Sequence, residues 1–431
     1  MEKEKTKVLV NNTIMMYILS IAKLVIPLIS LPYLTRVLSV ECYGSVAYAR
    51  SVVSYLQILI DFGFILSTTK DIVNLIKKKK SPAIVIGDTM YAQGLLCIVS
   101  TIAMLIMCFG MDILKGYELF AMFTLVPSIL SMFLFEYVFR AYEKMDKIAI
   151  RYVIARVISL ILILFFVKGD SDIYLMPIFD TIATIVAIVL VSIQMKKLGV
   201  SVSFSFKRFM HAIKVLKESF IFFLSNFATT AFSALNTLLI GIFLTKSDVA
   251  YWSVAMQLVS AVEALYTPIT NSVFPTMLKE KDLKIVHKIL LIYMPLIFAG
   301  CGLILLLGDW AVTLVLEDSY IMSSTLLKYL IPVLIASFPG LLYGWPCLGA
   351  INKQGTNTMA TIVAALFQTF GIGILLIIGQ FNLLAICIVR CLAEFVLAGY
   401  KMIAVHKYKN LFDGGSSKDV DLLEMVNIGE E

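Results

Sequence analysis

Histidine and paired cysteine, the residues that most often hold metal ions, are scarce in this sequence. It has three histidines, far apart along the chain, at His211, His287 and His406. Its seven cysteines are scattered, and no two of them are spaced as C-x-x-C. Metal sites need clustered ligands, and a disulfide framework needs an even, ordered set of cysteines. We therefore expect no metal centre, no disulfide framework and no cofactor.

Charge is the second shortage, since only 15% of the 431 residues are charged and 60% are hydrophobic. Apolar runs of about 20 residues recur from one end of the chain to the other, and each is long enough to cross a bilayer as a helix. The alternating segments of about ten residues that mark a transmembrane barrel do not appear. The sequence therefore predicts an all-α polytopic membrane protein.

The apolar runs predict about twelve spans in two groups of six. A basic connection over 196–217 separates the groups, which gives an N-terminal lobe over 1–195, a linker, a C-terminal lobe over 218–405 and a cytoplasmic tail over 406–431. YGSVA at 43–47 matches YWSVA at 251–255 and indicates a repeat. The predicted spans lie near 13–34, 45–66, 83–109, 117–139, 152–167, 173–195, 218–243, 250–275, 289–308, 320–344, 358–379 and 382–404.

The lysines and arginines outside these spans fall almost entirely on one side of the membrane. The exceptions are Arg36, Lys115, Lys168 and Lys246. Cytoplasmic loops carry an excess of Lys and Arg, so we expect both termini to be cytoplasmic. The run Lys77 to Lys80 is expected to set topology near anionic headgroups, and no nucleic-acid partner is expected.

Large polar loops and catalytic constellations are also missing. A membrane-embedded glycan polymerase or transferase would be expected to hold its sugars in a large outer loop, but the predicted outer connections have about a dozen residues or fewer. We therefore expect a protein that is not an enzyme.

The charges predicted to lie inside the membrane are the main functional signal, because a charge there costs about 2.5–3.5 kcal/mol unless it faces a partner or a water-filled cavity. Among residues well inside the spans, cations slightly outnumber acids in the first half but not in the second. A cationic cavity would attract an anion such as pyrophosphate. The predicted anion-binding residues are Lys23, Arg36, Arg50, Arg140 and Arg156, and the candidates for coupling to a proton or sodium gradient are Asp61, Asp180 and Glu263.

Several charges in or near the predicted spans also have a purely structural interpretation. Arg390 and Glu394, like Glu136 and Arg140, are four residues apart, so each pair is expected to neutralise itself on one helix. Arg50 and Asp61 are expected to share one face of a helix at two depths. Lys328 and Lys401 lie near span ends, where lysines can extend to the membrane interface.

Four stretches of the sequence resemble a known family: PYLTRVL at 32–38; YGSVAYA at 43–49 with DFGF at 61–64; FEYVFRAYEKM at 135–145; and NTLLIGIF at 236–243 with YWSVA at 251–255. In their order and spacing they are similar to Wzx-type O-antigen or polysaccharide flippases of the multidrug/oligosaccharidyl-lipid/polysaccharide exporter superfamily.

This resemblance implies a V-shaped pair of six-helix lobes around a central cavity that opens alternately to either side of the membrane. The implied substrate is an undecaprenyl-pyrophosphate-linked oligosaccharide, with Lys23 and Arg50 at positions that match cationic cavity residues. Membrane lipids and a polysaccharide polymerase with its chain-length regulator would be its partners. Two alternatives stay open: an organic-cation antiporter of the same superfamily, and a membrane-embedded polysaccharide polymerase.

Overall fold

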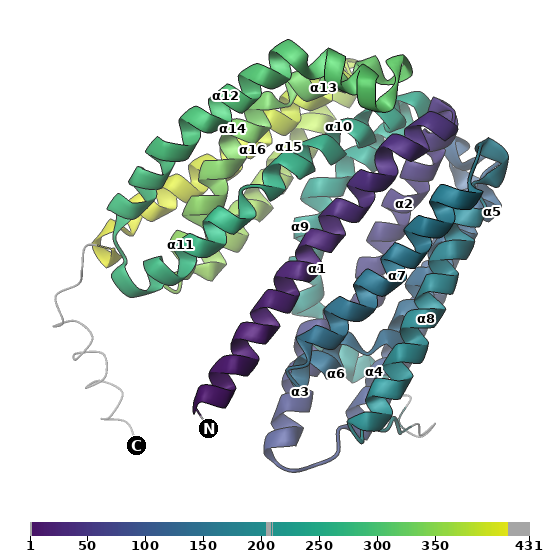
Figure 1. Ribbon diagram of the computed structural model, residues 1–431, viewed down its shortest axis with the longest axis vertical. Coiled ribbons are helices and arrows are strands. Elements are labelled where there is room, and N and C mark those ends of the chain that lie inside the picture. Colours follow the sequence, from purple (N-terminus) through teal and green to yellow (C-terminus); the bar gives the residue numbers. More distant parts are fainter. Residues whose placement is uncertain (1, 204–207, 209, 413–431) are drawn as a thin grey trace. The chain divides into compact units, whose positions relative to one another are not determined.

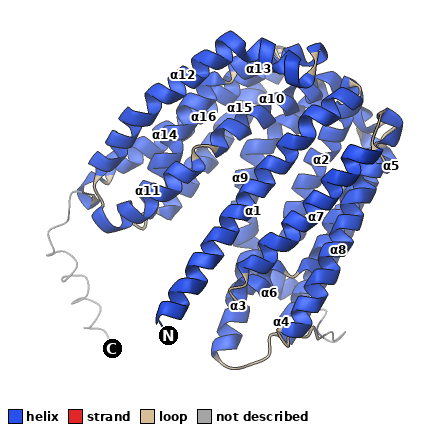
Figure 2. Ribbon diagram, in the orientation of Figure 1, coloured by secondary structure: helices blue, strands red, loops and turns tan. Residues whose placement is uncertain are grey.

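The computed structural model describes residues 2–203, 208 and 210–412, and within these ranges the chain is helical and contains no strand (Figure 2). Ten helical segments in the described ranges are long and apolar enough to cross a membrane. The protein is therefore a multi-pass, all-α membrane protein, as the sequence predicts. The predicted spans at 218–243 and 250–275 are also helical, but they are not among these ten segments. The predicted tail beyond residue 412 lies outside the described residues.

The chain divides into two compact units, one formed by residues 1–253 with 315–320 and the other by residues 254–314 with 321–431. The first unit contains the whole of the predicted N-terminal lobe, over 1–195, together with α9. The predicted lobes and the linker at 196–217 stay a prediction. Its helices, coloured purple to teal in Figure 1, are α1 (Glu2–Val37), α2 (Val40–Asp61), α3 (Phe64–Lys77), α4 (Ala83–Gly110), α5 (Glu118–Leu130), α6 (Glu136–Ala141), α7 (Met145–Phe166), α8 (Leu175–Lys197) and α9 (His211–Phe243).

The helix α10 begins in the first unit and ends in the second. The helices of the second part of the chain are α10 (Lys246–Ala264), α11 (Thr267–Glu280), α12 (Leu283–Leu316), α13 (Ile321–Tyr329), α14 (Ile331–Leu342), α15 (Gln354–Ile378) and α16 (Leu383–Lys407). A seven-residue π-helical segment, η6 (Tyr343–Gly349), follows α14 directly and contains a non-helical residue, Gly344.

The predicted span at 45–66 is two helices rather than one. Helix α2 begins after Ser39, whose hydroxyl caps the helix by accepting a hydrogen bond from the Cys42 backbone N–H. It ends at Asp61, because Phe62 and Gly63 both adopt left-handed conformations before α3 starts. Gly63 is required here, since a Cβ would lie 2.5 Å from the Cβ of Phe222 on α9.

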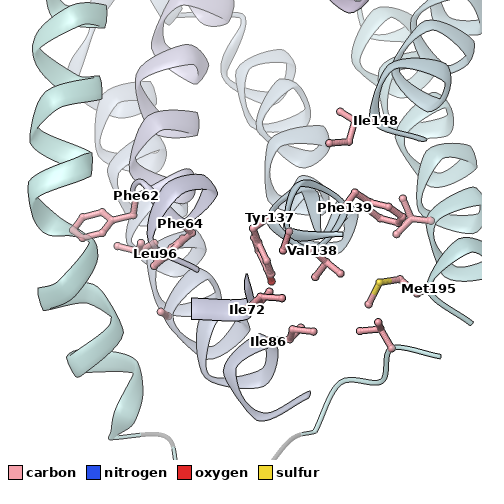
Figure 3. Close-up of a cluster of buried hydrophobic side chains, with 14 of the residues drawn as sticks. Phe62, Phe64, Ile72, Ile86, Leu96, Tyr137, Val138, Phe139, Ile148 and Met195 are labelled. Atoms are coloured by element: carbon pink, nitrogen blue, oxygen red, sulfur yellow. The ribbon is translucent and has the colours of Figure 1, made fainter. Parts of the chain in front are cut away.

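A buried apolar cluster packs α3, α4, α6 and the C-terminal part of α8 together at one end of the first unit (Figure 3). Ile72, Ile86, Val138 and Phe139 are fully buried within it. Burial of this kind contributes about 25 cal/mol per Å² of apolar surface removed from water, and within a membrane it also provides close packing. The cluster holds the end of α2 and the short helix α6 in fixed positions beside the polar residues described below.

The connection between α8 and α9 is tied to α4. Arg208 donates two hydrogen bonds to the buried carboxylate of Asp88, from Nε at 3.0 Å and from Nη2 at 2.6 Å. The Ser203 backbone N–H donates to the Ala83 carbonyl. The hydrogen bonds to Asp88 raise the pKa of the Arg208 guanidinium above its ordinary value, so this guanidinium stays charged at any physiological pH.

Candidate functional site

A polar cavity of about 330 Å³ lies inside the first unit. Side chains from α1, α2, α7 and α8 line it, together with residues from the segment 127–137. Six of the lining residues are acidic or basic: Lys23, Asp61, Glu136, Arg151, Arg156 and Asp180. So many charges around one cavity are expensive inside a membrane protein and usually mark a pathway or a binding site.

Helix α7 presents three polar side chains to the cavity because of their spacing. Arg151, Tyr152 and Arg156 lie within a stretch of six residues, and Ala155 lines the cavity between them. Residues three and four apart lie on the same side of a helix, so these side chains share one surface of α7. The face of α8 opposite carries one carboxylate, Asp180, and otherwise small residues, which leave the space open: Ala183, Thr184 and Ala187.

The helices α7 and α8 are joined through the Asp180 carboxylate. Its Oδ1 atom accepts a hydrogen bond from Arg156 Nη1 at 3.0 Å and another from Ser159 Oγ at 2.7 Å. The Arg156 side chain is nevertheless about half exposed. Arg156 is therefore held by Asp180 but is still reachable by a ligand in the cavity.

The ring of Tyr152 is shared by two cations from different helices. Lys23 Nζ of α1 lies 5.5 Å from the ring centroid, and Arg156 Cζ lies 5.7 Å from it. Both distances are within the range of a cation–π interaction, which contributes about 0.5–1 kcal/mol at an exposed position. Within the described residues, Lys23 makes no ion pair. Lys23 is thus an exposed cation, held in position by an aromatic ring, with its charge unneutralised.

The carboxylate of Asp61, at the C-terminal end of α2, is positioned by a neutral neighbour. Gln57 Nε2 donates a hydrogen bond to Asp61 Oδ1 at 2.9 Å and another to Ser131 Oγ at 3.1 Å. This amide bridges α2 to the segment after α5. Asp61 therefore faces the cavity without a cation at ion-pair distance in the described structure.

The other two lining charges, Glu136 and Arg151, have different kinds of partner close by. Arg140 Nη2 pairs with Glu136 Oε1 at 2.6 Å on α6, which confirms the predicted pair at that spacing. Arg151 is almost fully buried; it donates to the Leu134 carbonyl, and its guanidinium lies 5.2 Å from the Phe139 ring centroid. The six lining charges are balanced, and Arg140 adds one formal positive charge to the group.

The structure brings together four of the eight predicted site residues: Lys23, Asp61, Arg156 and Asp180. Arg140 does not line the cavity but pairs with Glu136, which does. Arg36 and Arg50 lie elsewhere in the first unit, in the last turn of α1 and on α2. Glu263 belongs to the second unit. The roles assigned to these residues from the sequence stay predictions.

Sequence reasoning missed Arg151, Tyr152 and Gln57. The sequence predicts a span that starts at residue 152 and so places Arg151 on its cytoplasmic flank, whereas α7 begins at Met145. The spacing of Arg151 and Arg156 around Tyr152 was the available signal. Gln57 carries no charge, so the sequence alone gives no sign that its side chain belongs to the site.

A family model described as polysaccharide biosynthesis protein matches residues 9–281 of the chain. A curated Shigella dysenteriae protein named "Putative O-antigen transporter" is 28% identical over 338 residues, which cover 76% of this chain and 83% of that protein.

Two solved structures show which fold the chain shares. One is an inward-facing multidrug resistance MATE family transporter of the MOP superfamily, with a TM-score of 0.64, 15% identity and coverage of 90% of this chain and 98% of that one. Another is the lipid II flippase MurJ in an inward closed conformation, with a TM-score of 0.61, 14% identity and coverage of 95% of both chains. At these identities the likeness establishes the fold alone.

Proposed function

Because this chain belongs to the polysaccharide biosynthesis protein family, we propose that it is a flippase for a lipid-linked oligosaccharide. The substrate in this proposal is an undecaprenyl-pyrophosphate-linked repeat unit of an O-antigen or a related polysaccharide. The flippase moves this unit from the cytoplasmic to the outer leaflet of the bacterial inner membrane. It does so as a transporter, without changing a covalent bond.

The observation that carries the proposal is the exposed Lys23 in the polar cavity of the first unit. Its ammonium group lies over Tyr152, makes no ion pair in the described chain and is accompanied by the half-exposed Arg156. Phosphate oxygens are strong acceptors for ammonium and guanidinium groups. A pyrophosphate that enters the cavity gains a charge-assisted hydrogen bond from Lys23 and shares Arg156 with Asp180.

The remaining elements of the proposal concern the transport cycle. The two units expose the cavity alternately to the two sides of the membrane, and both termini are cytoplasmic. Arg36, Arg50 and Arg140 contact the pyrophosphate at other stages of this cycle. Asp61, Asp180 or Glu263 is the place where a proton or a sodium ion would couple to transport. Membrane lipids surround the protein, and a polymerase with its chain-length regulator receives the product.

The family and the curated relative favour this function over an organic-cation antiporter. The fold itself does not decide, since both a multidrug transporter and a lipid II flippase share it. The polar cavity of the first unit, with its unpaired lysine, fits an anion better than an organic cation. No comparable argument supports a membrane-embedded polymerase.

The test replaces Lys23 by Met in cells that depend on this protein for surface polysaccharide. A charge-assisted hydrogen bond contributes about 1.5–3 kcal/mol, and each 1.4 kcal/mol is a factor of ten, so we expect export to fall about tenfold or more at equal protein level. Lipid-linked repeat units should accumulate on the cytoplasmic face of the membrane.

Lys168→Met is the matched control. Lys168 Nζ also lies over a tyrosine ring in the first unit, 5.6 Å from the centroid of Tyr33, but Lys168 does not line the cavity. This variant should export polysaccharide normally. Equal export by wild type, Lys23→Met and Lys168→Met would rule out Lys23 as the anion site. Accumulation of single repeat units on the outer face would point to a polymerase instead.

A further inference from the structure

A second polar cavity, of about 380 Å³, lies inside the second unit, and none of its lining residues belongs to the first cavity. It is bounded by α11, by the end of α14 with the π-helical segment η6, and by α15 and α16. Its polar lining consists of Thr267, Thr270 and Asn271 on α11, Asn357 on α15 and Lys401 on α16.

The cation of this cavity is deeply buried and forms no ion pair with the residues that the structure describes. Lys401 is only 7% exposed, so its ammonium group is enclosed by the protein and does not extend freely into water. In the described part of the chain, no carboxylate lies within ion-pair distance of its ammonium group. A buried charge without a partner is costly, and it persists where a ligand or a function compensates for it.

An unsatisfied acceptor lies close to the same ammonium group. The Oδ1 atom of Asn357 is buried and makes no hydrogen bond within the described structure. Both groups lie beside Gly344. A Cβ added at this residue would lie 3.0 Å from Asn357 Oδ1 and 3.4 Å from Lys401 Nζ. Buried polar atoms are almost always hydrogen-bonded, so an orphaned one beside a lone cation indicates a missing partner.

The backbone around Gly344 is shaped to leave this space open. Gly344 is the non-helical residue within the π-helical segment η6, and such segments occur frequently at functional sites. Trp345 follows it and forms a wall of the cavity, with 57% of its surface exposed and its ring edge-on to Phe274. An exposed indole offers a flat apolar surface on which the face of a sugar ring can pack.

The depth of the cavity suits a headgroup at one membrane surface. Lys401 lies six residues before the end of α16, which corresponds to about 9 Å along the helix. Lys279, Lys281 and Lys353 lie at the neighbouring helix ends, on the side where the distribution of basic residues predicts the cytoplasm. The cavity is therefore at the depth of the inner-leaflet headgroups.

We propose that this cavity of the second unit binds a phosphate ester whose neighbouring groups are hydroxyls. The phosphate oxygens accept hydrogen bonds from Lys401, and a hydroxyl donates to Asn357 Oδ1. Two molecules in the inner leaflet carry this chemistry: the sugar pyrophosphate of a lipid-linked oligosaccharide, and the headgroup of a phosphoglycerolipid. The first source rests on the proposed function, whereas the binding chemistry itself does not. The Trp345 surface favours the sugar pyrophosphate.

The experiment measures ligand binding to the full-length protein by native mass spectrometry from detergent. One probe is a short-chain prenyl-pyrophosphoryl N-acetylglucosamine, and the other is phosphatidylglycerol. We expect wild type to bind one molecule of at least one probe at this site. Lys401→Met should lower the affinity for that molecule at least tenfold, and Lys401→Arg should retain it. Asn357→Asp should also weaken it, because a carboxylate of the same size beside Lys401 neutralises the ammonium group.

Two controls separate this site from its surroundings and from the first cavity. Lys279→Met removes an exposed lysine in the last turn of α11 that does not line the cavity, and this variant should bind both probes like wild type. Lys23→Met should still bind the ligand molecule whose binding depends on Lys401. The site in the second unit can therefore be tested even if the proposed function is wrong. Thermal unfolding of each variant checks that it is folded.

The outcome for each probe decides the proposal and the source. Lys401-dependent binding of the prenyl-pyrophosphoryl sugar supports the site and assigns it to the substrate. Lys401-dependent binding of phosphatidylglycerol alone supports the site and assigns it to membrane lipid. If folded Lys401→Met and Asn357→Asp proteins bind both probes as tightly as wild type does, the proposal is overturned.

Discussion

Arg390 and Glu394 form an ion pair of 2.7 Å on successive turns of α16, with side chains only 7% and 6% exposed. Taking two such charges out of water costs several kcal/mol per ion, and their attraction compensates for this cost only while both are present. The pair is therefore tolerated while both residues are present, but loss of either residue leaves a buried charge without its partner and destabilises the protein. This property distinguishes it from the accessible cations of the first unit.

Glu394→Gln should accordingly destabilise the protein more than the double replacement Arg390→Met with Glu394→Leu. Removing one partner leaves an uncompensated buried charge and costs about 3–5 kcal/mol, whereas replacing both by apolar residues is often neutral. Thermal unfolding of the purified single and double variants measures the difference. An unfolding temperature for the double variant at or below that of Glu394→Gln would contradict the account.

The sequence predicts ion pairs within one helix and misses those between helices. Spacings of four residues correctly indicated Glu136 with Arg140 and Arg390 with Glu394. Arg156 pairs with Asp180, and Lys328 pairs with Asp309 at 2.6 Å, across separate helices. Lys328 lies near a span end, where it could extend to the interface, but its ammonium group is paired with Asp309. The register between two helices depends on packing that no local spacing encodes.

At the scale of the element, α2 lies very close to the start of α10 at Gly44. A Cβ at Gly44 would lie only 1.9 Å from the backbone carbonyl oxygen of Lys246, the first residue of α10. Small residues allow helix backbones in membranes to approach this closely. The YGSVA motif therefore contains its glycine for packing, whatever the function of its neighbours.

Gly44→Ala should destabilise the protein by about 1–3 kcal/mol, because the added methyl forces the two backbones apart. Gly94→Ala on α4 is the matched control, since a Cβ there has nothing within 4 Å. Alanine in place of an unconstrained helical glycine is neutral or slightly stabilising, by about 0.5–1 kcal/mol. Unfolding temperatures of the two variants test this, and equal destabilisation would show that Gly44 is not a close contact.

The elements themselves were largely predictable, but their interruptions were not. Long apolar runs predict helices reliably because each must satisfy its own backbone in the bilayer. The left-handed residues Phe62 and Gly63 that end α2, and the π-helical turn around Gly344, carry no signal in hydropathy. Both breaks adjoin polar cavity residues, so the least predictable parts of the chain surround its candidate sites.

At the scale of the whole molecule, the distribution of lysine and arginine predicts the orientation in the membrane. Lys80 follows α3 at a predicted cytoplasmic connection, and Lys115 precedes α5 at a predicted outer one. Both are exposed. All seven native cysteines are free and buried, so we expect them to contribute little background signal when single introduced cysteines are labelled.

Intact cells treated with a membrane-impermeant maleimide should therefore label Lys115→Cys and leave Lys80→Cys unlabelled. Permeabilised cells should label both variants. The wild type, with its buried thiols, is the control and should stay unlabelled throughout. Labelling of Lys80→Cys but not Lys115→Cys in intact cells would reverse the predicted topology.

The charges of the first cavity have a consequence for the membrane potential. Together with Arg140, the group carries one formal positive charge when empty, and a bound pyrophosphate diester with about two negative charges reverses this to one negative charge. In the proposed cycle the loaded cavity moves a negative charge outward and the empty cavity returns a positive charge inward. A potential that is negative inside favours both movements, by about 2.3 kcal/mol per charge per 100 mV. The voltage then assists the loaded and the empty steps equally, and neither half of the cycle works against the field.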